Sequence, residues 1–274
     1  MMKPRDALTY LILTVLGLLT VTPFILMALI SFMTQAQSMA YPPSFWPSPA
    51  TVANYQQAVS AAGLGRYFLN SMIVAVVTTA GQLLFSSMAG YAFARFRFPG
   101  REGLFLLVLA TMMIPTQVNL VPLFSLMANL GLVDSYAALI LPGLVGAFGV
   151  FLMRQAFLAF PTELEDAALI DGLTPWGTFW RIALPLSAPA LASLGIFSFV
   201  TAWNAFLWPL VVTNSDTLFT LPVGLAAFKS SFREVTDWGV LMAATTLTIA
   251  PAVIAFLLGQ KHFVRGLAAG AVKE

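Results

Sequence analysis

Six long apolar runs constrain the fold of this chain more than any other feature of its sequence. A helix needs about 20 apolar residues to cross a hydrocarbon core of about 30 Å. Only helices and closed barrels satisfy the backbone in lipid, and these runs lack the alternation of barrel strands. The sequence therefore predicts an all-α polytopic membrane protein with six transmembrane helices. They cover approximately residues 8–32, 68–94, 103–127, 137–158, 188–212 and 238–260.

The first run resembles a secretory signal only at its start. Lys3 and Arg5 precede an apolar stretch that extends from Ala7 to Phe32. This stretch is longer than the roughly 7–15 residues of a signal core, and it lacks a small-x-small cleavage site. We interpret it as a retained transmembrane helix. In later runs, Pro115, Pro122 and Pro209 predict kinks.

The basic residues predict the orientation, because short cytoplasmic loops retain Lys and Arg. With both termini in the cytoplasm, ten basic residues lie inside and three lie outside, which together are the 13 of the chain. We therefore expect a multi-pass protein of a bacterial or archaeal cytoplasmic membrane with both termini cytoplasmic. The outer three are Arg66, Lys229 and Arg233, and the inner ten are Lys3, Arg5, Arg95, Arg97, Arg101, Arg154, Arg181, Lys261, Arg265 and Lys273.

Composition argues against several classes of function. The chain has no Cys and one His, His262, so neither thiol chemistry nor a metal site is expected. A net charge of +2 does not suggest a nucleic-acid partner. The centres of the spans carry no charge, which argues against the ion or proton relay of a secondary transporter. We predict no catalytic residue, no metal and no cofactor in this chain.

The loop between the fourth and fifth runs, 159–187, is rich in charge and reads as two short helices. Thr162 and Glu165 have the spacing of a capping box, which predicts a helix start. Gly172 stands where a left-handed residue would end that helix near Asp171. Thr174 as N-cap and Pro175 at the first helical position then begin a second helix that leads to Pro185.

One face of the first short helix combines Leu164, Ala167, Ala168 and Asp171, at helical spacing. So small a face buries little surface alone, so the helix either packs under neighbouring loops or inserts into a groove of a soluble partner. The residues are compatible with both alternatives, because Glu165 could serve as a helix cap and nothing more, and the acids could form an ordinary solvated surface.

The same loop carries a known motif. Its letters "DAALIDG", followed after nine residues by "IALP", resemble the EAA motif of ABC importer permeases, E-A-A-x-x-x-G-x(9)-I-x-L-P. The motif's positions match Ala167, Ala168, Gly172, Ile182, Leu184 and Pro185. Asp166 stands where the motif has Glu, and Glu165 precedes it, which leaves open which acid pairs with a partner.

Further strings extend the resemblance over essentially 1–274. They are "GRYFLNSMIVA", "YAFARFRFPG", "MMIPTQVNLVPLF", "TAWNAFLWPL" and "QKHFVRGLAAGAVKE". The chain is similar to the shorter permease subunit of maltose and glycerol-3-phosphate importers, in the carbohydrate-uptake branch of the family. The resemblance implies the type I ABC importer permease fold, with 1–66 as an N-terminal helix and outer segment, 67–260 as the core and 261–274 as a cytoplasmic tail.

The resemblance also implies partners and a mechanism. Such a chain forms half of a heterodimeric pore with a second permease subunit, and it works with two cytoplasmic ATPase subunits and an extracytoplasmic sugar-binding protein. The stretch 164–172 would be the coupling helix that docks on an ATPase subunit. The chain lacks the GxxxxGK[ST] phosphate loop, so ATP and Mg would be bound by the partner. We expect a transporter subunit and not an enzyme.

A substrate path is less constrained by the residues. Asn204 between Trp203 and Trp208 combines an amide for hydroxyl groups with indoles for a sugar ring. The alternative is an interhelical hydrogen bond with interface tryptophans. The outer loop 213–237 and the tail 261–274 are candidate partner surfaces, or an ordinary loop and anchor. A non-sugar solute such as glycerol-3-phosphate, or a membrane scaffold, is the alternative function.

Overall fold

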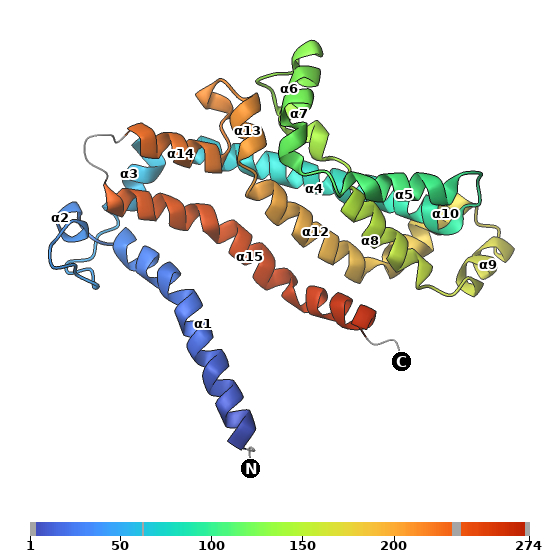
Figure 1. The fold of residues 1–274 in the computed structure, drawn as a ribbon, viewed down its shortest axis with the longest axis horizontal. Coiled ribbons are helices and arrows are strands. Elements are labelled where there is room, and N and C mark those ends of the chain that lie inside the picture. The colour runs from blue at the N-terminus through green and yellow to red at the C-terminus, as the bar shows by residue number, and fades with distance from the viewer. Residues whose placement is uncertain (1–3, 62, 232–236, 272–274) are drawn as a thin grey trace. The chain divides into compact units, whose positions relative to one another are not determined.

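The computed structural model describes residues 4–61, 63–231 and 237–271, and within these ranges it contains helices and no strand (Figure 1). The predicted all-α fold is thereby confirmed. The helices are α1 Pro4–Ser31, α2 Gln35–Ser38, α3 Ala53–Ala61, α4 Leu64–Arg95, α5 Arg101–Thr111, η1 Thr116–Asn119, α6 Leu120–Asn129, α7 Tyr136–Ile140, η2 Leu141–Gly143, α8 Ala147–Leu158, α9 Glu163–Ile170, α10 Pro175–Thr178, η3 Phe179–Ala183, α11 Leu184–Leu186, α12 Ala188–Trp203, α13 Leu207–Val212, η4 Asp216–Leu218, α14 Leu221–Ser231 and α15 Trp238–Ala271.

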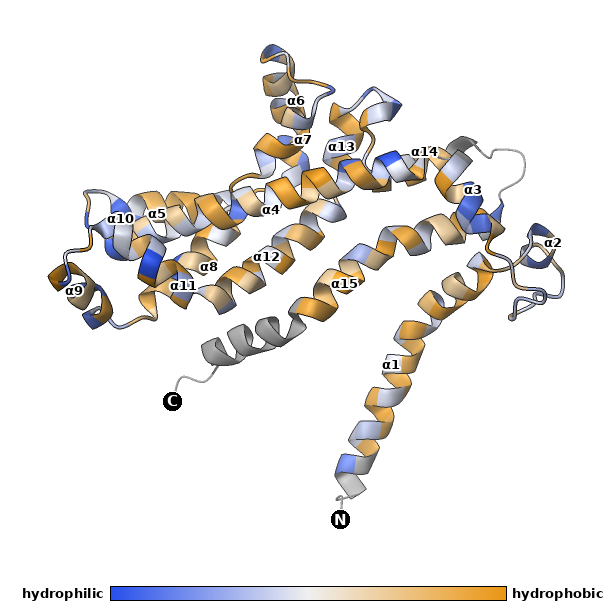
Figure 2. Cartoon of the chain, turned by 180° about the vertical axis from the view of Figure 1, so that it is seen from behind, coloured by the Kyte–Doolittle hydropathy of each residue, from blue (hydrophilic) through white to orange (hydrophobic). Residues whose placement is uncertain are grey.

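Within the described ranges, three helices are long and apolar enough to cross a membrane without a break, namely Leu8–Ser31, Leu64–Arg95 and Trp238–Leu258. Figure 2 shows the apolar residues that run along α1. Three further candidates are pairs of shorter helices bent at a break. The bends are 92° between Arg101–Thr111 and Thr116–Asn129, 42° between Tyr136–Gly143 and Ala147–Leu158, and 77° between Pro175–Leu186 and Ala188–Trp203.

The 92° and 42° bends correct the expectation of continuous helices in the third and fourth runs, a break after Trp203 corrects it in the fifth, and proline accounts for much of the difference. Pro115 follows the end of α5 as the residue before η1, and Pro142 lies in η2. The fifth run stops at Trp203 and restarts at Leu207. Pro209 lies in the first turn of α13, where its missing N–H costs nothing, whereas a continuous helix would need that N–H for the Ala205 carbonyl.

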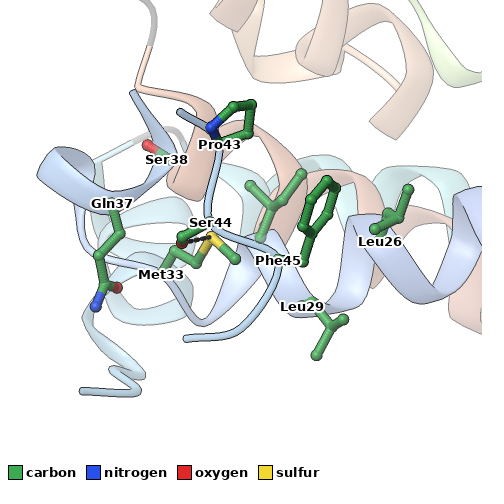
Figure 3. A pocket seen from close by; sticks show the side chains of 9 residues that line it. Leu26, Leu29, Met33, Gln37, Ser38, Pro43, Ser44 and Phe45 are labelled. Atoms are coloured by element: carbon green, nitrogen blue, oxygen red, sulfur yellow. Dashed lines mark hydrogen bonds between the residues drawn. The ribbon is translucent and has the colours of Figure 1, made fainter. Parts of the chain in front are cut away.

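Contacts divide the chain into two units, one formed by Met1–Phe68 with Leu221–Ala250 and the other by Leu69–Thr220 with Pro251–Glu274. In the first unit, the buried Asn54 of α3 donates to the carbonyls of Ser31, at 2.8 Å, and Met33, at 2.7 Å. The Asn54 side chain therefore supplies partners to the carbonyls at the end of α1. In the same unit, a small and mostly apolar pocket is lined by Leu26, Met33 and Phe45, among other residues (Figure 3).

The core of the second unit lies where α4, α8, η3 and α12 meet. Tyr91, Met153, Phe157, Phe179 and Leu194 are each at most 5% exposed there. The Tyr91 ring centre lies 5.2 Å from that of Phe157 and 5.1 Å from that of Phe179. Aromatic pairs at such distances stabilise beyond the area that they bury.

Glycine allows α4 and α8 to approach closely. A Cβ on Gly90 of α4 would lie 2.8 Å from the backbone nitrogen of Arg154 in α8. A Cβ on Gly149 of α8 would lie 2.5 Å from Ser86 Oγ of α4. Small residues at such crossings are the common solution for packing helices within a membrane.

Gly90→Ala is expected to destabilise the protein by about 1–3 kcal/mol, the usual cost of overpacking. Gly103→Ala in α5 is the matched control, because a Cβ there would have no atom within 4 Å. Thermal unfolding of both variants in detergent micelles measures the difference. Equal unfolding temperatures would contradict the close contact of α4 with α8.

Candidate functional site

The charge-rich loop between α8 and α12 begins with α9, Glu163–Ile170, but without the expected capping box. Thr162 already has helical dihedral angles, φ −66° and ψ −25°, and its side chain accepts no capping hydrogen bond. An N-cap residue needs an extended conformation to aim its hydroxyl at the first turn. The prediction of a capping box at Thr162 and Glu165 is therefore wrong, and the Glu165 carboxylate has a different partner.

That partner is Arg95, the last residue of α4. Arg95 Nε lies 2.9 Å from Glu165 Oε1, an ion pair without the angle of a hydrogen bond. Arg95 Nη2 donates to the Phe160 carbonyl at 2.9 Å. Only 9% of the Arg95 side chain and 19% of the Glu165 side chain are exposed. Tyr91, one turn earlier in α4, interacts electrostatically with both charges. No local sequence pattern indicates this pair, beyond the positive charge of Arg95.

The end of α9 is as predicted. Gly172 has φ +80°, the left-handed conformation that favours glycine. Its N–H donates to the Leu169 carbonyl at 3.1 Å, and the Leu173 N–H donates to the Ala168 carbonyl at 2.9 Å. These two bonds form a Schellman motif, which satisfies carbonyls that the helix end would leave without partners.

The second short helix starts as predicted and then departs from α-helical geometry. The Thr174 hydroxyl accepts from the Gly177 N–H at 3.1 Å, and Pro175 begins α10. Residues Phe179–Ala183 form a π-helical turn, η3, before α11. Pro185 explains the change, because it has no N–H for the carbonyl four residues earlier. The I-x-L-P part of the motif thus runs from the end of the π-helical turn into α11, directly before the 77° bend into α12.

The residues of α9 differ in exposure, and all but Glu165 and Ala168 are exposed. Ala168 is 2% exposed, whereas Leu164 is 43% and Ile170 is 85% exposed. The predicted four-residue face is therefore divided, because Ala168 packs within the chain. The sequence analysis did not single out Ile170, because an apolar residue two positions before the Gly172 turn is the only indication that the sequence offers. Of the other predicted coupling residues, Ala167, Asp166, Asp171, Gly172 and Pro185 are exposed, and Ile182 and Leu184 are partly buried.

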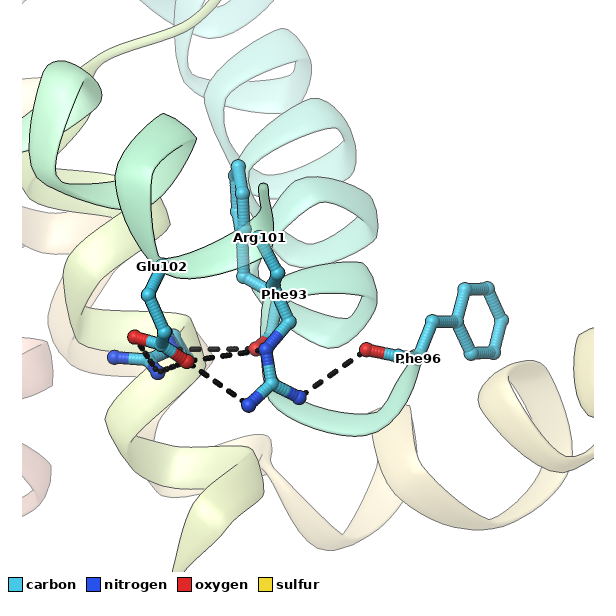
Figure 4. A network of polar contacts seen from close by, with 5 residues as sticks. Phe93, Phe96, Arg101 and Glu102 are labelled. Atoms are coloured by element: carbon cyan, nitrogen blue, oxygen red, sulfur yellow. Dashed lines mark hydrogen bonds and ion pairs between the residues drawn. The ribbon is translucent and has the colours of Figure 1, made fainter. Parts of the chain in front are cut away.

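A second ionic network lies beside this loop, at the turn from α4 to α5 (Figure 4). Arg154 Nη2 lies 3.1 Å from Glu102 Oε1, and Arg101 Nη2 lies 2.9 Å from the same oxygen. Arg154 Nε also donates to the Phe93 carbonyl at 3.3 Å. Because 59% of the Glu102 side chain is exposed, each pair contributes at most about 1 kcal/mol.

The three residues proposed for a substrate path have partners within the chain. Trp203 is 1% exposed and stacks on Phe199. Asn204 Nδ2 donates to the Val200 carbonyl, and Trp208 Nε1 donates to the Ala138 carbonyl, both at 2.9 Å. The Trp208 bond joins α13 to α7, as the alternative interpretation expects, whereas the Asn204 bond is local to α12; a contact with substrate stays a prediction.

Asp134, in the turn between α6 and α7, holds the segment that follows α13. Its carboxylate accepts from the N–H groups of Asn214, at 2.9 Å, and Ser215, at 3.0 Å, and from the Ser215 hydroxyl. Hydrogen bonds, first from the Ser215 hydroxyl and then from the two N–H groups, lower the pKa of Asp134. Asn70 of α4 adds bonds to the carbonyls of Thr217 and Phe219, both at 2.9 Å.

These anchors fix the start of the predicted outer loop. Part of that loop, 232–236, lies outside the described residues, as does the end of the tail, 272–274. The sequence reasoning did not identify Asp134 or Asn70, whose partners are 80 and 147 residues away along the chain.

Broken and unbroken apolar helices with a charged helical loop define the class of this chain, a polytopic permease-type membrane protein. Residues 82–269 match the sequence profile of the binding-protein-dependent transport system inner membrane component. The chain belongs to this family. It is therefore a transporter subunit and not an enzyme.

Relatives and solved structures agree with this membership. The chain is 45% identical over 230 residues to the arabinooligosaccharides transport system permease protein AraQ of Halalkalibacterium halodurans, covering 84% of this chain and 82% of the relative. It is 38% identical over 225 residues to the sn-glycerol-3-phosphate transport system permease protein UgpE of Yersinia pestis, covering 82% and 80%. A bacterial ABC transporter that imports alginate shares the fold, with a TM-score of 0.85, 23% identity and coverage of 96% and 99%.

Gly172→Val is expected to abolish transport while the chain still inserts into the membrane. Valine at φ +80° is strained by about 1–2 kcal/mol and distorts the turn between α9 and α10. Gly172→Asn is the matched control, because Asn adopts the left-handed conformation more readily. Solute uptake by membrane vesicles, normalised to inserted protein, measures both. Normal uptake by the Val variant would contradict a role for the turn in transport.

Proposed function

We propose that this chain is a permease subunit of an ATP-driven importer of sugars, with an oligosaccharide as cargo. The identity to the arabinooligosaccharide permease, over most of both chains, supports this cargo. The second candidate is glycerol-3-phosphate, which the similarity to UgpE favours at lower identity. The first is a neutral solute and the second an anion.

The exposed side of α9 carries the proposal for coupling to an ATPase. Leu164 and Ile170 expose apolar surface outside the membrane-spanning candidates, next to the exposed carboxylates of Glu163, Asp166 and Asp171. Burying a side chain of the size of Ile stabilises an interface by about 1.5–3 kcal/mol. A groove with an apolar floor and a basic rim on an ATPase subunit would complement this surface.

The remaining partners follow from the same proposal. A second permease subunit would complete the pore, two ATPase subunits would bind ATP and Mg in the cytoplasm, and an extracytoplasmic binding protein would deliver the sugar. Both termini would be cytoplasmic, which places α9 on the side of the ATPase. The segment anchored by Asp134 and Asn70 would then face the binding protein.

Reconstitution of the purified complex in liposomes tests this function. The tagged chain is expected to co-purify with a second permease and an ATPase subunit, and the binding protein loaded with arabinan oligosaccharides is expected to stimulate ATP hydrolysis. Stimulation by glycerol-3-phosphate alone would favour the second candidate. A complex that neither retains an ATPase subunit nor responds to any solute would contradict the proposal.

A further inference from the structure

We propose that Arg95 is a positioning residue that fixes the coupling helix α9 to the end of α4, so that movement of α9 is transmitted to this membrane-spanning helix. The inference rests on the proposed function, since it concerns how ATPase closure would reach the pore. It assigns the carboxylate of Glu165 to a contact inside the chain. Asp166 is left exposed for the ATPase subunit.

The guanidinium of Arg95 contacts two residues of the loop, Phe160 and Glu165. Nε pairs with Glu165 in the first turn of α9, at 2.9 Å, and Nη2 donates to the carbonyl of Phe160, which lies before that helix, at 2.9 Å. Arg95 therefore holds the connector from α8 to α9 at both of its ends. A planar guanidinium suits this role, because its donors are fixed in direction.

The ion pair of Arg95 with Glu165 is largely shielded from solvent, unlike the ion pairs of Glu102. The side chains of Arg95 and Glu165 are 9% and 19% exposed, whereas the Glu102 carboxylate of the adjacent network is 59% exposed. Less water around a pair means less screening of its attraction and a larger penalty when one partner is removed. Loss of either Arg95 or Glu165 should therefore release α9 from α4.

Apart from the ion pair with Arg95, few contacts hold α9 in position, and one of them, the interaction of Tyr91 with the Glu165 carboxylate, also comes from α4. With eight residues α9 is shorter than a helix that is stable by itself. Among the ion pairs of the described residues, the one with Arg95 is the one that reaches α9. Ala168 is the one buried residue of the helix, and it contributes a single methyl group.

The end of α4 is a well-packed support for α9. One turn before Arg95, Tyr91 contacts both Phe157, at the end of α8, and Phe179, in η3. The end of α8 and the second half of the loop thus contact the same turn of α4. A displacement of α9 would move the cytoplasmic end of this helix if the ion pair holds, and would be absorbed by the loop if it does not.

The test uses the complete transporter in liposomes with variants of both partners. Glu165→Gln removes one charge at nearly constant size, Arg95→Gln removes the other charge and shortens the side chain, and the double variant Arg95→Glu with Glu165→Arg restores the pair in reverse. Arg101→Gln is the matched control, because it removes an exposed ion pair from the same turn. Arg95→Lys keeps the charge and loses the planar fork, and it serves if Arg95→Gln is not recovered from the membrane.

Two quantities separate positioning from folding, namely the amount of ATPase subunit retained and the ATP hydrolysed per solute imported. A folding defect lowers ATP hydrolysis and solute import together, so the ATP hydrolysed per solute imported is unchanged. We expect each single variant to retain the ATPase subunit and to raise the ratio about tenfold, a usual size for coupling between sites. The reversed pair should bring the ratio most of the way back to that of the unmodified complex. Arg95→Lys should give a ratio between those of Arg95→Gln and the unmodified complex. Arg101→Gln should change the ratio less than about twofold.

An unchanged ratio in Glu165→Gln and Arg95→Gln would overturn the inference, as would a raised ratio that the reversed pair does not improve. These outcomes are separate from failure of the proposed function, which would appear as absence of import by the unmodified complex.

Discussion

A membrane-spanning helix that breaks must find new partners for its backbone, because lipid offers none. Side chains from elsewhere in the chain meet this requirement. Gln82 Nε2 donates to the Gly143 carbonyl at 3.0 Å where α7 and η2 give way to α8. Trp208 Nε1 donates to the Ala138 carbonyl, which has no helical N–H partner because Pro142 stands four residues later. These bonds from distant side chains supply partners for backbone groups at the break between η2 and α8.

The candidate coupling loop is held in place by a few residues at the end of α4. Gly90 lets α8 lie close, Tyr91 joins the aromatic cluster, and Arg95 holds the loop that leaves α8. These residues occupy less than two helical turns. The end of α4 is thus where the membrane-spanning part of the second unit meets the part proposed to contact the ATPase.

The sequence predicted features that depend on local chemistry. The first, second and sixth apolar runs, the left-handed Gly172 and the cap at Thr174 each follow from a few adjacent residues, and each is confirmed. The capping box failed because the Glu165 carboxylate has a charged partner 70 positions away, which no local pattern encodes. The π-helical turn and the break after Trp203 needed the positions of Pro185 and Pro209 relative to the helices around them. Ile170 and Asp134 escaped notice for the same reason, since exposure and distant partners depend on the folded chain.

The central claim is that the exposed side of α9 contacts an ATPase subunit, and cross-linking in the assembled transporter tests it most directly, with a reagent whose maleimide reacts with a thiol of this chain and whose photoreactive group then bonds to the neighbouring subunit. The chain has no cysteine, so a single Cys introduced at the exposed Ile170 would be the one reactive thiol of this subunit. Ile170→Cys is predicted to cross-link to the ATPase subunit, and Asn214→Cys, on the proposed outer side, is predicted not to. An intact complex in which Ile170→Cys gives no cross-link, or in which Asn214→Cys does, would contradict the account.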